Sequence, residues 1–362
     1  MLADERDVRL DVGAQLRDVA ERTALRAPLR RDARRSGIGR RLPAHVSEPA
    51  ADSSGEIVRD MSATTLTPSL EIGGTHVTAG LVELDGGRAK VLHHRREALD
   101  ASGTADQIID RIAHCAAAIR APHGSTWGAA VPGPFDYERG IGLFRGVGKF
   151  ESLYGARLEA PLRTRLPHIG PMRFLNDAEA FLVGEWSAGA VRGHGRAAGL
   201  TLGTGIGSAF LAGGVAVTTG RTVPPEGRAD LLTWDDRPLE ESVSRRAIIT
   251  SYERATGVRT DVQEIATMAR SGVRAAHDVL EHAFRTLGRA LGPWWARFDA
   301  SVVVVGGAMA GSWDLIKPAL AAGIETEAGG ALPPMVTPHH PELAPLIGAA
   351  LHARRPDRPG NA

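Results

Sequence analysis

From residue 69 onward, short apolar runs alternate with longer segments in which apolar residues recur every three or four positions. Residues 127–131 and 300–305 have the length and composition of buried strands, whereas residues 104–121 place their apolar side chains on one helical stripe. This alternation of strands and helices predicts an α/β fold. Further strands are expected at residues 172–175, 198–202 and 208–211, and a long helix is expected at 275–298.

A strand pair around a glycine turn opens each half of this region. The first turn is Gly73-Gly74-Thr75 and the second is Gly203-Thr204-Gly205, each with an apolar run on either side. Successive backbone N–H groups without β-carbons hold phosphate well, although either turn alone is more typical of a plain tight hairpin. A third turn, Gly306-Gly307, follows an apolar strand and would let a nucleoside approach the backbone. The repeated opening predicts an internal duplication.

Residues 1–65 differ from the rest in being arginine-rich and interrupted by prolines. We interpret them as a disordered or mis-annotated extension, with Met61 as an alternative translation start. A short DNA-binding head built on residues 15–25 is the competing hypothesis, but this segment lacks the apolar core of a helix-turn-helix unit.

Composition narrows the class of protein. The chain has 362 residues, of which 43% are hydrophobic, a formal net charge of +1 and a single cysteine, Cys115. Because acidic and basic residues balance, the chain as a whole has no excess positive charge to attract nucleic acid or an acidic membrane. A single cysteine excludes an internal disulfide framework and a cysteine-rich zinc cluster. No apolar stretch is long enough to span a bilayer, and the amino end lacks a secretory signal pattern. We therefore expect a cytoplasmic enzyme that uses neither nucleic acid nor a membrane.

Two common nucleotide motifs are absent. Gly148-Lys149 is followed by Phe150, and Leu143 stands where a P-loop would begin with glycine. Gly203–Gly207 reads G-x-G-x-G and precedes an apolar strand, where a dinucleotide-binding fold would place a helix. The chain is thus predicted to be neither a P-loop enzyme nor a Rossmann dehydrogenase.

The motifs and their order resemble the ROK family of sugar kinases and repressors. The resemblance covers about residues 69–351 and implies a two-lobed actin-like ATPase (ribonuclease H-like) fold, with lobes at 66–175 and 176–356. It also implies ATP and Mg²⁺ as cofactors, a sugar substrate and a homodimer. The motifs that carry it are residues 70–75 and 202–207 for phosphate, 304–307 for adenosine, and 131–134 and 175–178 for the sugar.

Site residues follow from this resemblance position by position. Asp177 would be the catalytic base, although an aspartate at the start of a helix is equally well explained as a cap. Glu71 would lie near the metal ion and contact it indirectly. The remaining predicted contacts are Asn176, Glu226, Glu240, Gly133 and Lys149 for the sugar, and Gly73, Gly74, Thr75, Gly203, Thr204, Gly205, Gly306 and Gly307 for ATP.

The chain also departs from the family pattern. Glu71 stands where the family usually has aspartate, and Lys149 lies in the loop from which the family often offers an asparagine. Ala229 replaces the histidine of the family's zinc site, and residues 237–240 replace its cysteine run, so no zinc is predicted.

The leading hypothesis is an ATP-dependent kinase for the 6-hydroxyl of a glucose-like hexose or aminohexose. Glu71 and the Gly-Lys-Phe loop look similar to kinases for aminosugars such as kanosamine, and glucose remains an alternative. A sugar-responsive repressor without kinase activity is the main alternative, and a pseudo-kinase or a kinase with another phosphate donor is a further one.

Overall fold

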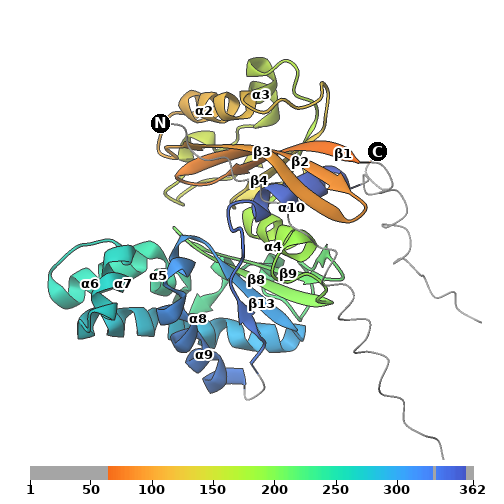
Figure 1. The fold of residues 1–362 in the computed structure, drawn as a ribbon. Coiled ribbons are helices and arrows are strands. Elements are labelled where there is room, and N and C mark those ends of the chain that lie inside the picture. Colours follow the sequence, from red (N-terminus) through yellow and green to blue (C-terminus); the bar gives the residue numbers. More distant parts are fainter. Residues whose placement is uncertain (1–63, 329–331, 356–362) are drawn as a thin grey trace, which may run out of the picture. The chain divides into compact units, whose positions relative to one another are not determined.

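The computed structural model describes residues 64–328 and 332–355 (Figure 1). The predicted extension at 1–65 and the Met61 start therefore lie almost wholly outside the described residues. The two lobe ranges, 66–175 and 176–356, stay a prediction, while the sheets below can be described directly.

The first sheet has five strands in the order β3-β2-β1-β4-β7. β1 and β2 are antiparallel, with Ile72 opposite Val77 across the predicted turn, and β4 and β7 continue the sheet in parallel. All five residues of β4 are buried, as expected for a central strand covered on both faces. The strands are β1 Thr65–Ile72, β2 His76–Asp85, β3 Arg88–Ala98, β4 Trp127–Val131 and β7 Met172–Asn176.

The second sheet repeats this pattern in the order β10-β9-β8-β13-β14. β8 and β9 form the antiparallel pair, and β13 and β14 follow in parallel. The two sheets therefore share strand order and direction, which confirms the internal duplication. The strands are β8 Arg196–Leu202, β9 Ile206–Ala212, β10 Val215–Ala216, β13 Val302–Gly306 and β14 Met335–Val336; the short pairs are β5 Phe135–Asp136 with β6 Ile141–Gly142, and β11 Thr233–Trp234 with β12 Arg237–Pro238.

Helices cover both sheets. In Figure 1, α2 and α3 lie on one face of the first sheet, and α10 and α4 lie on the other. α8 packs against α9 beside the second sheet. The helices are α2 Ala105–Ala117, α3 Glu159–Arg165, α4 Asp177–Ala188, α5 Glu240–Val243, α6 Arg245–Thr256, α7 Val262–Arg270, α8 Arg274–Phe298, α9 Trp313–Ala328 and α10 Ala344–Ala353, with 3₁₀ turns η1 Glu151–Leu153, η2 Pro225–Gly227, η3 Ala229–Leu231 and η4 Ala308–Ser312.

Two predicted boundaries shift. β1 begins at Thr65, four residues before the first apolar run, because it pairs with β2 along its whole length. α2 ends at Ala117, short of the predicted residue 121, with Ala118 as its C-cap.

α4 is apolar around most of its circumference, and such a helix is stable only when it is enclosed. It crosses α10 closely: a β-carbon at Gly184 would lie 1.9 Å from the carbonyl oxygen of Ala344, and one at Gly348 would lie 1.9 Å from that of Ala180. α10 in turn packs on β1 and β4. The amino end of α4, which carries Asp177, is thereby held against the first sheet.

No helix among the described residues is both long enough and apolar enough to cross a bilayer.

Candidate active site

The first phosphate turn is a closed hairpin. The backbone N–H of Gly73 donates to the carbonyl of His76 at 2.8 Å. Glu71, at the end of β1, accepts a hydrogen bond from Thr78 Oγ1 at 3.0 Å, and its other oxygen lies 3.3 Å from His76 Nε2. The carboxylate is therefore fixed beside the turn by its own hairpin.

The second phosphate turn is joined to Glu240. Glu240 Oε1 accepts from the backbone N–H of Ile206 at 2.9 Å, and a β-carbon at Gly205 would lie 2.1 Å from the same oxygen. Burial raises the pKa of Glu240, while the Ile206 N–H partly offsets that rise. Only glycine allows the carboxylate this close. Glu240, predicted to contact the sugar, is thus also a support for the phosphate turn.

The third glycine turn, Gly306-Gly307, lies against β8, the strand that leads into the second glycine turn. Gly307 has φ +88°, and a β-carbon there would lie 2.4 Å from the carbonyl oxygen of Leu202. β8 and β13 are paired in parallel with Gly306 opposite Thr201. The predicted adenosine turn and second phosphate turn are therefore neighbours at one edge of the second sheet.

Asn176, rather than Asp177, occupies the N-cap position of α4. Asn176 is the N-cap of α4, and its Oδ1 accepts from the N–H groups of Ala178 and Glu179 at 3.0 and 3.3 Å. Its Nδ2 donates to the hydroxyl of Tyr137 at 3.1 Å. Asp177 is the first helical residue and accepts from Ala178 at 2.9 Å. The side-chain cap of α4 is therefore chiefly Asn176, and among the described residues the Asp177 carboxylate accepts a hydrogen bond through Oδ1 alone.

Several charges act on Asp177. Burial raises its pKa most, the ammonium of Lys149 and the Ala178 N–H lower it, and the carboxylates of Glu71 and Asp230 raise it. A carboxyl with a raised pKa holds a proton more tightly than an ordinary aspartate, which suits a base that must accept one. The same interactions place Glu71, beside the first glycine turn, and Asp230, of the 226–230 loop, within electrostatic reach of one carboxyl.

Lys149 is presented by a well-supported loop. Glu151 accepts hydrogen bonds from the N–H groups of Gly146, Val147 and Gly148, at 3.1, 2.8 and 2.9 Å. Phe150 is buried with a left-handed φ of 57°. A β-carbon at Gly74 would lie 4.0 Å from Lys149 Cδ. The loop thus directs the lysine stem toward the first phosphate turn and its charge toward Asp177.

Glu226 lies in a loop with other charges that sequence reasoning missed. Glu226 has φ 55°, a left-handed conformation that costs a non-glycine residue about 1–3 kcal/mol. Arg228 donates to Glu226 Oε2 at 3.2 Å and to both oxygens of Asp230 at 3.1 and 2.5 Å. The guanidinium also lies on Gly133, where a β-carbon would be 2.9 Å from Nη2.

Several predicted residues are therefore placed near one another, and three others join them. Gly133, Lys149, Asn176, Asp177, Glu226 and Glu240 are linked by contacts or by mutual electrostatic effects, and their roles stay predictions. Tyr137, Arg228 and Asp230 were missed. The charged run 226–230 was a signal in the sequence, but its partner Gly133 lies too far along the chain to be paired by inspection.

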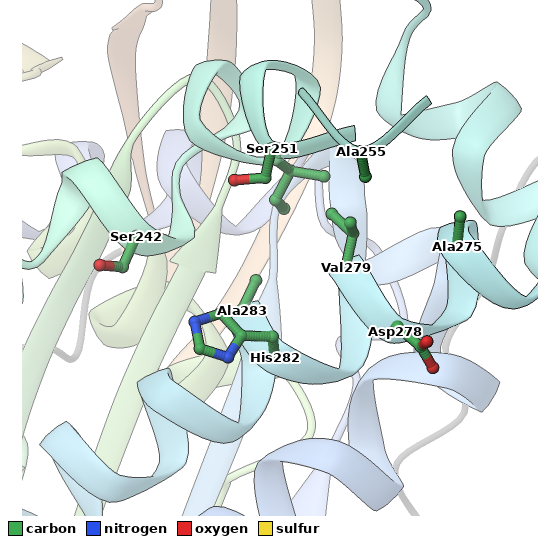
Figure 2. A pocket seen from close by; sticks show the side chains of 9 residues that line it. Ser242, Ser251, Ala255, Ala275, Asp278, Val279, His282 and Ala283 are labelled. Atoms are coloured by element: carbon green, nitrogen blue, oxygen red, sulfur yellow. The ribbon is translucent and has the colours of Figure 1, made fainter. Parts of the chain in front are cut away.

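A pocket of about 310 Å³ lies elsewhere, between α5, α6 and α8. Figure 2 shows Ser251 and Ala255 of α6 above Val279 and His282 of α8. None of the predicted site residues lines it. We assign it no part in the chemistry.

Comparison with known proteins gives the family. The model of the ROK family matches residues 67–229 and 235–355. A glucokinase of Thermotoga maritima is 28% identical over 272 residues, which are 68% of this chain and 83% of the relative. A ROK family glucokinase from Streptomyces griseus, solved with glucose and AMPPNP, is 24% identical, with a TM-score of 0.64 over 80% of this chain and 99% of that one.

A regulator is similar as well. A ROK family transcriptional regulator, described as a homologue of the E. coli MLC protein, is 20% identical with a TM-score of 0.62, over 80% of this chain and 78% of that one. Together with the paired, duplicated sheets, these likenesses confirm the actin-like ATPase fold.

Proposed function

The chain belongs to the ROK family, and from this we propose that it is an ATP-dependent kinase for the 6-hydroxyl of a glucose-like hexose or aminohexose, with Asp177 as general base. The observation that carries the proposal is the environment of Asp177. Among the described residues its Oδ2 has no hydrogen bond, burial raises its pKa, and the charges of Lys149 and Glu71 act on it. Glu71 and the stem of Lys149, whose Cδ would lie 4.0 Å from a β-carbon at Gly74, place the carboxyl beside the first glycine turn.

The protein groups divide the work as follows. Asp177 accepts the proton of the sugar hydroxyl as its oxygen attacks the γ-phosphorus, because a free hydroxyl is too weak a nucleophile at neutral pH. The bond from the γ-phosphorus to the β–γ bridging oxygen breaks, and ADP leaves with that oxygen. The N–H groups of the turns at Gly73-Gly74-Thr75 and Gly203-Thr204-Gly205 hold the phosphates. Glu226 and Asn176 contact the sugar, and the hydrogen bond from Asn176 to the Tyr137 hydroxyl holds the Asn176 side chain in place. Gly306-Gly307 admits the nucleoside.

A magnesium ion fits this donor set through Glu71. Mg²⁺ prefers oxygen ligands and keeps several waters, so it is commonly bound by one or two carboxylates and the phosphates of the nucleotide. Both oxygens of Glu71 already have protein partners, which favours contact through water. When bound, the ion would neutralise charge on the phosphates.

The charge of the site supports an aminohexose. Among the described residues, the carboxylates of Glu71, Asp177, Glu226, Asp230 and Glu240 outnumber the cations that act on them, which are Lys149, Arg228 and Arg246. An ammonium on the sugar would be attracted to such a surplus, whereas glucose would rely on hydrogen bonds alone. Kanosamine and glucose are therefore the two leading substrates. A cytoplasmic homodimer without zinc completes the proposal.

A repressor is the second candidate, because a ROK family transcriptional regulator shares the fold and residues 1–65 precede the family match. Both phosphate turns and Asp177 would then have no task. Specific binding of the full chain to its own upstream DNA at physiological salt, without sugar turnover, would favour the repressor.

The deciding experiment is a coupled ADP-release assay with glucose and a panel of aminohexoses, run beside Asp177→Ala. We expect the variant to lose about 10²-fold or more in kcat, the usual effect of a positioned base. Replacing ATP by polyphosphate in the same assay tests the donor. Unchanged turnover in Asp177→Ala would remove the aspartate from the mechanism.

A further inference from the structure

Arg228 is a mostly buried cation at the centre of the sugar-side loops. Its side chain is 15% exposed, and that of Asp230 is 25% exposed, whereas the Glu226 side chain is 69% exposed. The fork of Arg228 meets both oxygens of Asp230, and its third nitrogen meets Glu226. A planar guanidinium is suited to such two-sided pairing, which a lysine cannot reproduce.

The same guanidinium connects two loops that are far apart in sequence. Gly133 belongs to the loop after β4, and a β-carbon there would lie 2.9 Å from Arg228 Nη2. Ser208 Oγ donates to the carbonyl of Gly227 and accepts from the N–H of Ala229, both at 2.8 Å, which fixes the backbone on either side of Arg228. The backbone around Arg228 is therefore fixed to Ser208 of β9, and its guanidinium lies against Gly133.

Glu226 needs such support. Its left-handed backbone is unfavourable for a residue with a β-carbon, and its carboxylate is mostly exposed. Among the described residues, the ion pair to Arg228 is the side-chain contact that restrains this carboxylate. Without it, this exposed carboxylate would be free to turn into solvent.

We propose that Arg228 is the positioning residue of the acceptor subsite: its guanidinium ties Glu226 and Asp230 to the Gly133 loop and so fixes the Glu226 carboxylate for the sugar. This inference rests on the proposed kinase function and deepens it. Because Arg228 acts through Glu226, the geometry of its guanidinium affects binding of the sugar acceptor rather than binding of ATP.

The charges around Asp177 supply a second readout. Lys149 lowers the pKa of Asp177, and Glu71 and Asp230 raise it, with burial as the largest cause of the rise. Arg228 is the counter-ion of Asp230. Removing Arg228 leaves the Asp230 charge uncompensated and so raises the pKa of Asp177 further. The acidic limb of the pH profile of kcat then moves to higher pH. Removing the Asp230 charge moves that limb to lower pH.

The test compares Arg228→Ala, Arg228→Lys and Asp230→Asn by steady-state kinetics with the sugar that wild type turns over best. We expect Arg228→Ala to raise KM for the sugar about 10- to 100-fold, the usual worth of charged hydrogen bonds, with little change in KM for ATP. Arg228→Lys keeps the charge but not the fork and should fall between. The acid limb should move in opposite directions in Arg228→Ala and Asp230→Asn.

Arg165→Ala is the matched control. Arg165 of α3 has a side chain that is 25% exposed and also pairs with two carboxylates, Asp106 and Asp110, away from the site. It should change neither KM. Equal losses in all variants, in step with their melting temperatures, or an unchanged KM for the sugar in Arg228→Ala would overturn the inference. Absence of turnover in wild type would instead remove the proposed function, and this inference with it.

Discussion

The burial of Asp177, the proposed base, has a cost in stability. Burial disfavours its ionised form and raises its pKa above that of the unfolded chain. Such a carboxyl contributes stability below the unfolded pKa, and the contribution is lost as pH rises through the folded pKa. At neutral pH, the ionised base therefore weakens the fold that positions it.

Asp177→Asn should accordingly be more stable than wild type at pH 7, and the gain should shrink toward pH 4. The measurement is the melting temperature of both proteins across that range. Asp314→Asn is the control of opposite sign, because pairing with Arg270 lowers the pKa of Asp314 and so stabilises the fold above the unfolded pKa. A gain for Asp177→Asn that does not vary with pH would contradict the argument.

At the residue scale, the sequence predicted the glycine turns and Asp177 because these belong to short contiguous motifs. It could not predict the approach of Arg228 to Gly133 or the hydrogen bond of Asn176 to Tyr137, because these residues are about 95 and 39 positions apart. The ambiguity between cap and base was also local in origin. Asn176 and Asp177 are neighbours, and only the backbone geometry decides which one caps α4.

At the level of elements, apolar content determined which ones could be predicted. β4 and β13 are buried along their whole length and match the predicted strands within two residues. β3, by contrast, is an edge strand with mostly exposed, charged side chains, and its sequence carries no apolar pattern. Its pairing with β2 is therefore visible only in the structure.

The crossing of α4 and α10 gives a prediction in which two effects compete. Alanine is favoured over glycine inside a helix by about 1 kcal/mol, so Gly348→Ala would stabilise an exposed helix. Here the new β-carbon would lie 1.9 Å from a backbone oxygen of α4, which cannot move without the helix. Because such overpacking typically costs about 1–3 kcal/mol, we expect net destabilisation and, since α4 begins at Asp177, a lower kcat.

Urea unfolding and the ADP-release assay measure these two effects of Gly348→Ala. Gly195→Ala serves as the control, because no atom lies within 4 Å of a β-carbon at that position. A Gly348→Ala protein as stable as wild type would show that α4 and α10 can separate freely, and the positioning of Asp177 by this crossing would have to be abandoned.

At the scale of the molecule, duplication places the phosphate turns in equivalent positions. Each turn joins the antiparallel strand pair of its own sheet, β1 with β2 and β8 with β9. The residues proposed to bind the sugar do not follow this symmetry. Lys149 comes from the first half, whereas Glu226, Arg228 and Glu240 come from the second. Sequence repetition predicts the shared nucleotide scaffold but not the acceptor subsite.

The same reasoning separates the catalytic region from residues 1–60. All predicted site residues lie between Glu71 and Gly307, and the family match begins at residue 67. A chain that begins at Met61 should therefore retain kcat and both KM values within about twofold, the range of changes that touch no specific contact. Parallel assays of the two chains measure this. Loss of turnover would assign the first 60 residues a part in catalysis, whereas loss of upstream DNA binding with turnover intact would assign them a regulatory one.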